Sequence, residues 1–245
     1  MTLSSLASRL SSFGKLCADL VFPLHCFGCE QEGTLACERC LALLPEPEYQ
    51  ECPLCRKPYQ KNGATCSDCR KQTALDGVLV ARPYRNRIIQ KLVFALKYRF
   101  VDVAADPLAQ LVAESILHHP LSLPDLVIPV PLHSRRIRYR GFNQAEVLGR
   151  KIIERLLPGT PIPIRADLLH RTRFTKPQMS TDSKIERTEN LQDAFEAPLE
   201  TAGPLVGKSI WLIDDVATTG STLDACARAL KHAGARTVWG IVVAR

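Results

Sequence analysis

Short apolar runs alternate with longer segments of helical periodicity through the chain after residue 76. The apolar runs have the length and composition of buried parallel strands, and they lie at Val78–Ala81, Leu126–Pro131, Ile210–Ile213 and Val238–Val243. Between them, apolar residues recur at three- and four-residue spacing, which predicts amphipathic helices over 88–96, 104–117, 145–157 and 223–230. This alternation predicts an α/β fold in which a parallel sheet is flanked by helices.

Weaker patterns predict several smaller elements. Ala166–Arg171 and Ala194–Glu196 predict short strands, and Ser183–Asn190 predicts a short charged helix. Residues 171–182 are polar, basic and without periodicity, which inside a compact domain is typical of a mobile functional loop. Residues 1–22 have leucines near helical spacing and predict an amphipathic helix that packs on the segment after it or lies on a membrane surface.

The stretch Ser209–Leu223 combines an apolar run, two adjacent carboxylates at Asp214 and Asp215, and a small hydroxyl-rich turn around Gly220. A helical pattern follows the turn. Backbone N–H groups and the helix dipole favour an anion at such a helix start. Two carboxylates beside it would repel a bare phosphate but accept hydrogen bonds from sugar hydroxyls. The stretch therefore predicts a sugar-phosphate site, and the alternative is an ordinary strand–turn–helix with a capping Thr or Asp.

This stretch resembles the phosphoribosyl pyrophosphate (PRPP) motif of type I phosphoribosyltransferases. The resemblance implies a type I phosphoribosyltransferase-like sheet, with PRPP bound together with Mg²⁺. It also implies that Asp214 and Asp215 hold the ribose hydroxyls. The residues that would hold the 5′-phosphate are Ala217, Thr218, Thr219, Gly220 and Ser221.

Eight cysteines form four Cys-x-x-Cys pairs, which are Cys26/Cys29, Cys37/Cys40, Cys52/Cys55 and Cys66/Cys69. Two such pairs complete a tetrahedral Zn²⁺ site with no open position, so we expect two structural zinc ions. Short loop closure favours sequential pairing, although spacing leaves open a cross-braced arrangement of the first pair with the third and the second with the fourth. Disulfides or a redox motif fit four regular pairs without a βαβ context less well. A double zinc-ribbon module over 23–73 and a larger domain over 76–245 are therefore predicted, after the helix of residues 1–22.

A basic run follows the strand that ends at Pro131, and its arginines are Arg135, Arg136, Arg138 and Arg140. Arginine offers paired donors to phosphate, and strand ends carry ligand sites in α/β sheets. The alternative is a solvated basic face before a helix. The run lies where type I phosphoribosyltransferases keep their pyrophosphate loop. The resemblance therefore makes its arginines candidates for contact with pyrophosphate or DNA, and further candidates are Lys97, Arg171, Gln178 and Arg187. The 171–182 loop would close over the pyrophosphate, and Arg173 and Lys176 join Asp214 and Asp215 as candidate catalytic residues.

Composition indicates a globular protein, with 245 residues, 46% hydrophobic residues and a mean hydropathy of -0.04. Basic and acidic residues balance up to residue 75, so the whole excess of +7 lies in the rest of the chain. That excess suits an anionic ligand, nucleic acid included, although solubility alone also accounts for it. No segment is long enough to span a membrane, and Lys15 and Asp19 interrupt the N-terminal apolar pattern. We therefore expect a cytoplasmic protein, where cysteines stay reduced.

Across nearly its whole length the chain resembles the ComF/GntX family of competence-associated, phosphoribosyltransferase-like proteins. The features that carry the resemblance are the Cys-x-x-Cys array, Leu96–Tyr98, Pro129–Pro131, Arg140–Gln144, the Arg171-x-Arg173-x-Thr175-x-x-Gln178 run with Arg187 and Asn190, and Ile213–Gly220. The resemblance implies a role in DNA uptake or in the use of DNA as a nutrient. The GntX name implies an alternative role in gluconate utilisation.

Three functions are compatible with these observations. The first is an enzyme that transfers phosphoribosyl from PRPP to an acceptor that the sequence does not identify. The second is a single-stranded DNA-binding protein with PRPP as a regulatory ligand, because Tyr98, Tyr139 and Phe142 interleave with basic residues as candidate stacking groups. The third is an adaptor whose zinc ribbons dock a helicase-like DNA-translocation protein.

Overall fold

The computed structural model describes residues 23–58, 62–98, 101–119, 121–172, 194–198 and 203–245. It divides into two compact units, Met1–Leu44 and Pro45–Arg245. Within the first unit, the described part contains helix α2 (Glu38–Ala42) and the first four motif cysteines. The predicted helix of residues 1–22 lies outside the described residues, and the predicted domain boundaries stay predictions.

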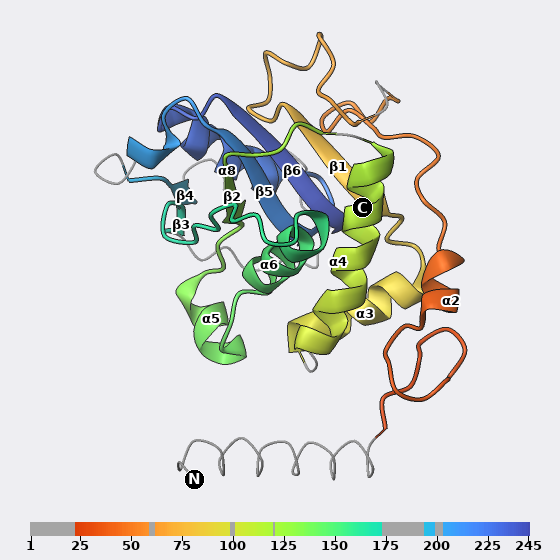
Figure 1. Ribbon diagram of the computed structural model, residues 1–245. Helices are drawn as coiled ribbons and strands as arrows, with labels where there is room; N and C mark the ends of the chain where they lie inside the picture. The colour runs from red at the N-terminus through yellow and green to blue at the C-terminus, as the bar shows by residue number, and fades with distance from the viewer. Residues whose placement is uncertain (1–22, 59–61, 99–100, 120, 173–193, 199–202) are drawn as a thin grey trace, which may run out of the picture. The chain divides into compact units, whose positions relative to one another are not determined.

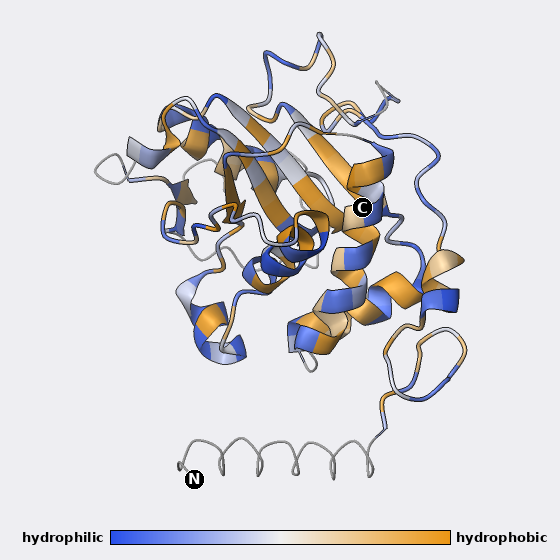
Figure 2. Ribbon diagram, in the orientation of Figure 1, coloured by the Kyte–Doolittle hydropathy of each residue, from blue (hydrophilic) through white to orange (hydrophobic). Residues whose placement is uncertain are grey.

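The larger unit is built on a four-stranded parallel sheet in the order β1-β6-β5-β2. The strands are β1 (Gly77–Arg82), β2 (Leu126–Pro129), β5 (Ser209–Val216) and β6 (Thr237–Ala244). Each begins or ends within a few residues of a predicted apolar run, and Figure 2 shows mainly hydrophobic residues along them. Such continuous runs arise because a parallel sheet is covered on both faces. The predicted α/β class, a parallel sheet flanked by helices after a cysteine-rich segment, is confirmed.

Helices cover the two faces of this sheet (Figure 1). The helices α4 (Val101–His118) and α6 (Gln144–Leu156) contact one face, and α3 (Arg87–Tyr98) packs against α4. On the other face, α8 (Ser221–His232) contacts β5 and β6. Its buried side chains, with Cys226 among them, share one core cluster with alternate strand residues such as Val78, Leu212 and Val242. Cys226 is thus a small residue of the core.

One predicted strand is shorter in the structure. The strand predicted over Ala166–Arg171 is reduced to β3 (His170–Arg171), which pairs antiparallel with β4 (Phe195–Glu196). Residues 166–168 form a bend, beside which Arg165 donates two hydrogen bonds to the Asp167 carboxylate, so the beginning of the predicted strand is not extended. The strand predicted over Ala194–Glu196 is confirmed as β4. A short 3-10 helix, η2 (Gly203–Leu205), precedes β5. The predicted helix Ser183–Asn190 lies outside the described residues.

The basic run after β2 forms the short helix α5 (Ser134–Arg140) rather than a loop. His133 caps its start by accepting a hydrogen bond from the Arg135 N–H through its ring nitrogen, at 3.2 Å. Gly141 ends it in the left-handed conformation, with φ 83°, and donates to the Ile137 carbonyl. No residue of α5 is buried, so the sequence has no apolar periodicity here that would predict a helix.

Candidate functional site

The two adjacent carboxylates lie at the carboxyl end of β5, between the ends of β2 and β6. Asp215 is 4% exposed, whereas Asp214 is partly exposed. Successive strand residues point to opposite faces of the sheet, so the two side chains diverge. The carboxyl edge of a parallel sheet is where such folds bind ligands.

The Asp215 carboxylate is held by side chains from two helices. Lys97 of α3 places its Nζ 2.9 Å from Oδ2 of Asp215. Gln144, at the start of α6, donates to the same oxygen through Nε2 at 3.4 Å. Gln144 is 4% exposed, so this amide is a buried polar group whose partners are specified by the fold. Lys97, which the sequence analysis names as a candidate contact to pyrophosphate or DNA, thus lies beside a carboxylate, and its predicted contact stays a prediction.

Gln144 links Asp215 to the basic helix. Arg140, the last residue of α5, donates to Oε1 of Gln144 at 3.1 Å and to the Tyr98 hydroxyl at 3.3 Å. Its guanidinium also lies 4.9 Å from the centre of the Tyr98 ring, within cation–π range. A continuous polar chain thus runs from Tyr98 through Arg140 and Gln144 to Asp215. Gln144 was missed as a site residue, because only its burial and partners distinguish it from a surface glutamine.

Asp214 has an unusual electrostatic environment. Burial, and next the charge of Asp215, raise the pKa of Asp214 to about 7, against the pull of the Asp215 backbone N–H, Lys97 and Arg171. The Asp215 N–H donates to Oδ1 of Asp214 at 2.8 Å. Near neutral pH, Asp214 can therefore carry a proton or lose it when a ligand supplies donors.

Two basic candidates lie in the same electrostatic neighbourhood. Burial, and next the charge of Arg136, lower the pKa of Arg171, which the Asp214 carboxylate opposes. The Arg171 guanidinium stacks 5.3 Å from the centre of the Phe195 ring. Arg135 and Arg138 are exposed on α5. Arg173, Lys176, Gln178 and Arg187 lie outside the described residues, as does most of the 171–182 loop.

The turn of residues 217–221 after β5 is the anion cradle that the sequence predicts, and hydrogen bonds hold its backbone. Ala217 donates its N–H to the Ala244 carbonyl at 3.0 Å, which ties the turn to the end of β6. The Thr219 and Ser221 hydroxyls are 2.9 Å apart, and the Ser221 N–H donates to the Thr219 hydroxyl at 3.3 Å. Gly220 has φ 82° and is the N-cap of α8, where it supplies no side-chain hydrogen bond; the backbone N–H groups of a helix start favour an anion.

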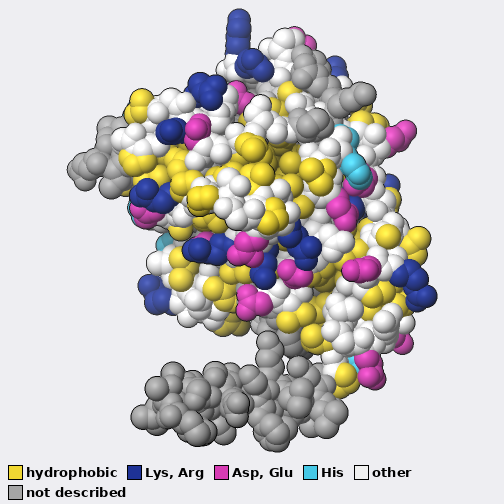
Figure 3. Space-filling model, viewed as in Figure 1, with side chains coloured by type: hydrophobic (Ala, Val, Ile, Leu, Met, Phe, Trp, Pro, Cys, Tyr) yellow, Lys and Arg dark blue, Asp and Glu magenta, His cyan; other side chains and the backbone are white. Residues whose placement is uncertain are grey.

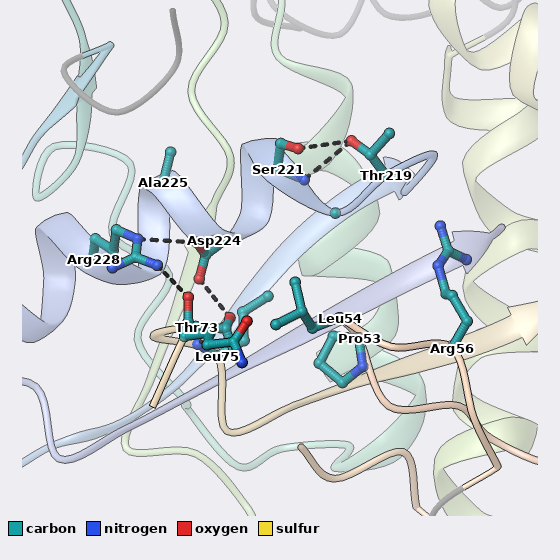
Figure 4. A pocket seen from close by; sticks show the side chains of 12 residues that line it. Pro53, Leu54, Arg56, Thr73, Leu75, Thr219, Ser221, Asp224, Ala225 and Arg228 are labelled. Carbon is teal, nitrogen blue, oxygen red and sulfur yellow. Dashed lines mark hydrogen bonds and ion pairs between the residues drawn. The ribbon is translucent and has the colours of Figure 1, made fainter. Parts of the chain in front are cut away.

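Asp224 anchors the first turn of α8 to the segment that precedes β1 (Figure 4). Its Oδ1 accepts from the Thr73 hydroxyl at 2.5 Å and from the Ala74 N–H at 2.8 Å. Its Oδ2 accepts from Nε of Arg228 at 3.0 Å. Asp224 therefore has a structural role, because its carboxylate joins α8 to the segment before β1.

The cysteines gather in two groups by sequential pairing. One group is Cys26, Cys29, Cys37 and Cys40, and the other is Cys52, Cys55, Cys66 and Cys69; within each, all sulfurs lie within 4.8 Å of one another. Tetrahedral zinc with Zn–S bonds of about 2.3 Å requires sulfurs about 3.8 Å apart. The Sγ–Sγ distances are 3.8 Å for Cys26–Cys37 and 3.9 Å for Cys55–Cys66. Both groups could therefore hold zinc, and the predicted sequential pairing is confirmed.

The face of the molecule in Figure 3 carries basic and acidic side chains interspersed. No helix within the described ranges has the length and apolar character needed to cross a membrane.

The chain is similar to competence proteins and to a DNA utilization protein. It is 28% identical to Competence protein F of Haemophilus influenzae over 230 residues, which are 90% of this chain and 97% of that protein. It is 31% identical to DNA utilization protein YhgH of Escherichia coli O157:H7 over 191 residues, 76% and 80% of the two chains. With Competence protein ComFC of Bacillus subtilis it shares 28% identity over 207 residues, 81% and 78% of the two chains. No family model matches the chain.

Two solved structures superpose in part. An allosteric regulatory enzyme of purine biosynthesis gives a TM-score of 0.35 at 19% identity, over 57% of this chain and 26% of that one. Glutamine phosphoribosylpyrophosphate amidotransferase from B. subtilis gives 0.33 at 17% identity, over 76% and 32%. At these scores, too little backbone is shared to assign a function.

Proposed function

Because the chain belongs to the ComF family, we propose that it binds PRPP or a related phosphosugar at the carboxyl end of β5, in the service of DNA uptake or DNA use. The observation that carries the proposal is the junction of two carboxylates with the open N-terminus of α8, in one continuous stretch of chain. The names of its relatives favour DNA handling over gluconate utilisation.

Each part of a phosphosugar has a matching group. Asp214 and Asp215 accept hydrogen bonds from the ribose hydroxyls, and the contact with Lys97 orients the Asp215 carboxylate. The turn of residues 217–221 receives the 5′-phosphate on backbone N–H groups and hydroxyls. A pyrophosphate group meets Arg171, whose charge acts on Asp214, and Arg136, whose charge acts on Arg171. Arg173, Lys176, Gln178 and Arg187 remain predicted partners of the same group.

If PRPP is consumed, the bond between C1′ and the pyrophosphate oxygen breaks, and pyrophosphate leaves with the electron pair. A nucleophile on the acceptor forms the new bond at C1′. The carboxylates of Asp214 and Asp215 stabilise the positive charge that develops on the ribose, and the arginines stabilise the leaving group. Bound Mg²⁺ would neutralise part of the pyrophosphate charge, and the paired carboxylates suit its oxygen-ligand preference.

The cysteine groups complete the proposal with one structural Zn²⁺ each. Four thiolates per ion leave no coordination position for a substrate, so these ions would stabilise the fold rather than take part in catalysis. The second group is embedded in the larger unit, where Gln50 exchanges two hydrogen bonds of 3.0 Å with the backbone of Val80 in β1.

The test is calorimetric titration of PRPP with Mg²⁺ into wild type and into Asp214→Asn/Asp215→Asn. The double variant should lose binding by at least a hundredfold, because it removes two charged acceptors while conserving shape. The matched control is Asp106→Asn, which replaces a carboxylate of α4 that pairs with Arg155 of α6. This variant should bind PRPP as wild type does. Equal affinity of double variant and wild type would reject the site. Pyrophosphate release with nucleobases, amines or DNA added then decides whether PRPP is consumed.

A second candidate function is direct binding of single-stranded DNA along α5. The observation that favours it is a short helix without buried residues whose Tyr139 ring is 82% exposed among arginines. An exposed aromatic ring among cations suits stacking on a base and contact with phosphates. Docking of a helicase-like partner on the cysteine module remains a prediction from the sequence.

A further inference from the structure

The second cysteine group touches the proposed phosphate turn through the turn Cys52–Arg56. Residues Pro53, Leu54 and Arg56 line one cavity of about 340 Å³ together with Thr219, Gly220 and Ser221 (Figure 4). A Cβ placed on Gly220 would lie 3.7 Å from the Pro53 carbonyl oxygen. The metal-binding turn is therefore a neighbour of the anion cradle within the same compact unit.

Arg56 occupies a backbone conformation that favours glycine. Its φ is 64°, and Glu30, at the matching place after Cys29, also has φ 64°. The turns are alike, since Arg56 donates its N–H to the Cys52 carbonyl at 3.1 Å and Glu30 donates to Cys26 at 2.9 Å. A non-glycine residue in this region costs about 1 kcal/mol. The Cys-x-x-Cys turn thus fixes the direction in which the Arg56 side chain leaves the backbone.

The Arg56 side chain ends on the phosphate turn. Its Nη2 donates to the carbonyl oxygen of Thr218. Glu51 lies behind it, with Oε2 3.7 Å from Nη1 of Arg56. Arg245, at the end of β6, donates to the Pro53 carbonyl at 2.8 Å and so joins the same turn to the sheet.

The bond to Thr218 sets the direction of the next N–H. In a trans peptide the C=O and the following N–H point to opposite sides. With the Thr218 carbonyl directed outward to Arg56, the Thr219 N–H is directed to the opposite side of the turn. Successive backbone N–H groups in a turn can form an anion-binding concavity, and the Thr219 N–H, turned away from Arg56, is free of that contact and can take part in one.

We propose that Arg56 is a positioning residue for the 5′-phosphate of the phosphosugar, which it serves by holding the Thr218–Thr219 peptide with its N–H turned toward the ligand. This inference rests on the proposed function, and it gives the second metal-binding turn a part in that site. Arg56 is bonded to the turn that would receive the 5′-phosphate, so its effect falls on phosphate binding and not on pyrophosphate binding.

The experiment compares Arg56→Gly with Glu30→Gly, each of which relieves one left-handed residue at matching places. Ribose 5-phosphate and inorganic pyrophosphate are titrated separately by calorimetry, and zinc content is measured. Arg56→Gly should weaken ribose 5-phosphate binding about tenfold, the value of one charge-assisted hydrogen bond, and leave pyrophosphate binding and zinc content unchanged. Arg56→Lys should restore part of the affinity, and Glu30→Gly should bind as wild type. Unchanged ribose 5-phosphate affinity, or an equal loss for both ligands, would overturn the inference.

A readout without ligand separates this inference from the proposed function. If wild type fails to bind ribose 5-phosphate, the proposed function is rejected. The positioning of the turn is then decided by hydrogen exchange of the amides of residues 217–221 in the ligand-free protein. Exchange should be faster in Arg56→Gly than in wild type and in Glu30→Gly, and equal exchange in all three would show that Arg56 does not hold the turn.

Discussion

At the scale of one residue, Asp214 of the proposed phosphosugar site has an environment that lowers the stability of the folded protein. Burial and the neighbouring Asp215 raise its pKa from 3.8 to about 7. The folded state then binds a proton that the unfolded state has released, so stability falls as pH rises from about 4 to about 7. Asp214→Asn should remove this cost and raise the free energy of unfolding by about 1 kcal/mol or more above pH 7. Urea unfolding at pH 5 and pH 8 measures it, with the larger gain expected at pH 8.

Asp125 supplies the control of opposite sign. The Ser209 N–H lowers the pKa of Asp125 by donating to its carboxylate at 2.8 Å. This carboxylate stabilises the fold above its unfolded pKa and loses that effect as pH falls, so Asp125→Ala should lower stability at both pH values. A gain for Asp214→Asn of the same size at pH 5 and pH 8 would contradict a raised pKa as its cause.

The helix α5 is the element on which the two candidate functions differ. Its exposed arginines meet either a pyrophosphate or the phosphates of single-stranded DNA. Replacing Arg135, Arg136 and Arg138 by Gln should weaken binding of a fluorescent single-stranded oligonucleotide at 50 mM salt. The slope of log affinity against log salt concentration should also become less steep by about 2, because DNA binding releases fewer counterions when phosphate contacts are lost. Fluorescence anisotropy measures both, and Arg165→Gln, a surface arginine paired with Asp167, is the control. An affinity for the oligonucleotide that changes neither with salt concentration nor with these substitutions would exclude DNA binding by α5.

Elements with a buried face could be predicted from the sequence, and those held by side-chain bonds could not. The sheet strands and α3, α4, α6 and α8 follow from apolar periodicity, because burial fixes their patterns. The acid pair and Gly220 were also predictable, since they lie next to one another in the chain. Gln144 and Arg56 were not, because their roles depend on contacts with Asp215 and Thr218 across 71 and 162 residues of sequence.

At the scale of the whole molecule, the two cysteine groups, each of which could hold a metal ion, belong to different compact units. The first lies in Met1–Leu44, and the second lies in Pro45–Arg245 with the sheet. The backbone around the second group is bonded to the sheet, since the Thr65 N–H donates to Asp76 at 2.8 Å and the Val78 N–H to Gly63 at 3.0 Å. The similar cysteine spacing of the two groups does not reveal this difference, which arises from long-range hydrogen bonds.

Loss of metal from the two groups should therefore have unequal effects. Cys69→Ser should reduce zinc content by about one ion, lower the melting temperature of the larger unit and weaken ribose 5-phosphate binding. The reason is that metal binding is folding free energy for the segment it orders, and that segment carries Arg56. Cys40→Ser should also remove about one ion but leave the binding of ribose 5-phosphate unchanged. Metal analysis, calorimetric unfolding and titration of each variant give the comparison. Equal loss of affinity in both variants would show that zinc supports the site through the whole chain rather than through the turn that holds Thr218.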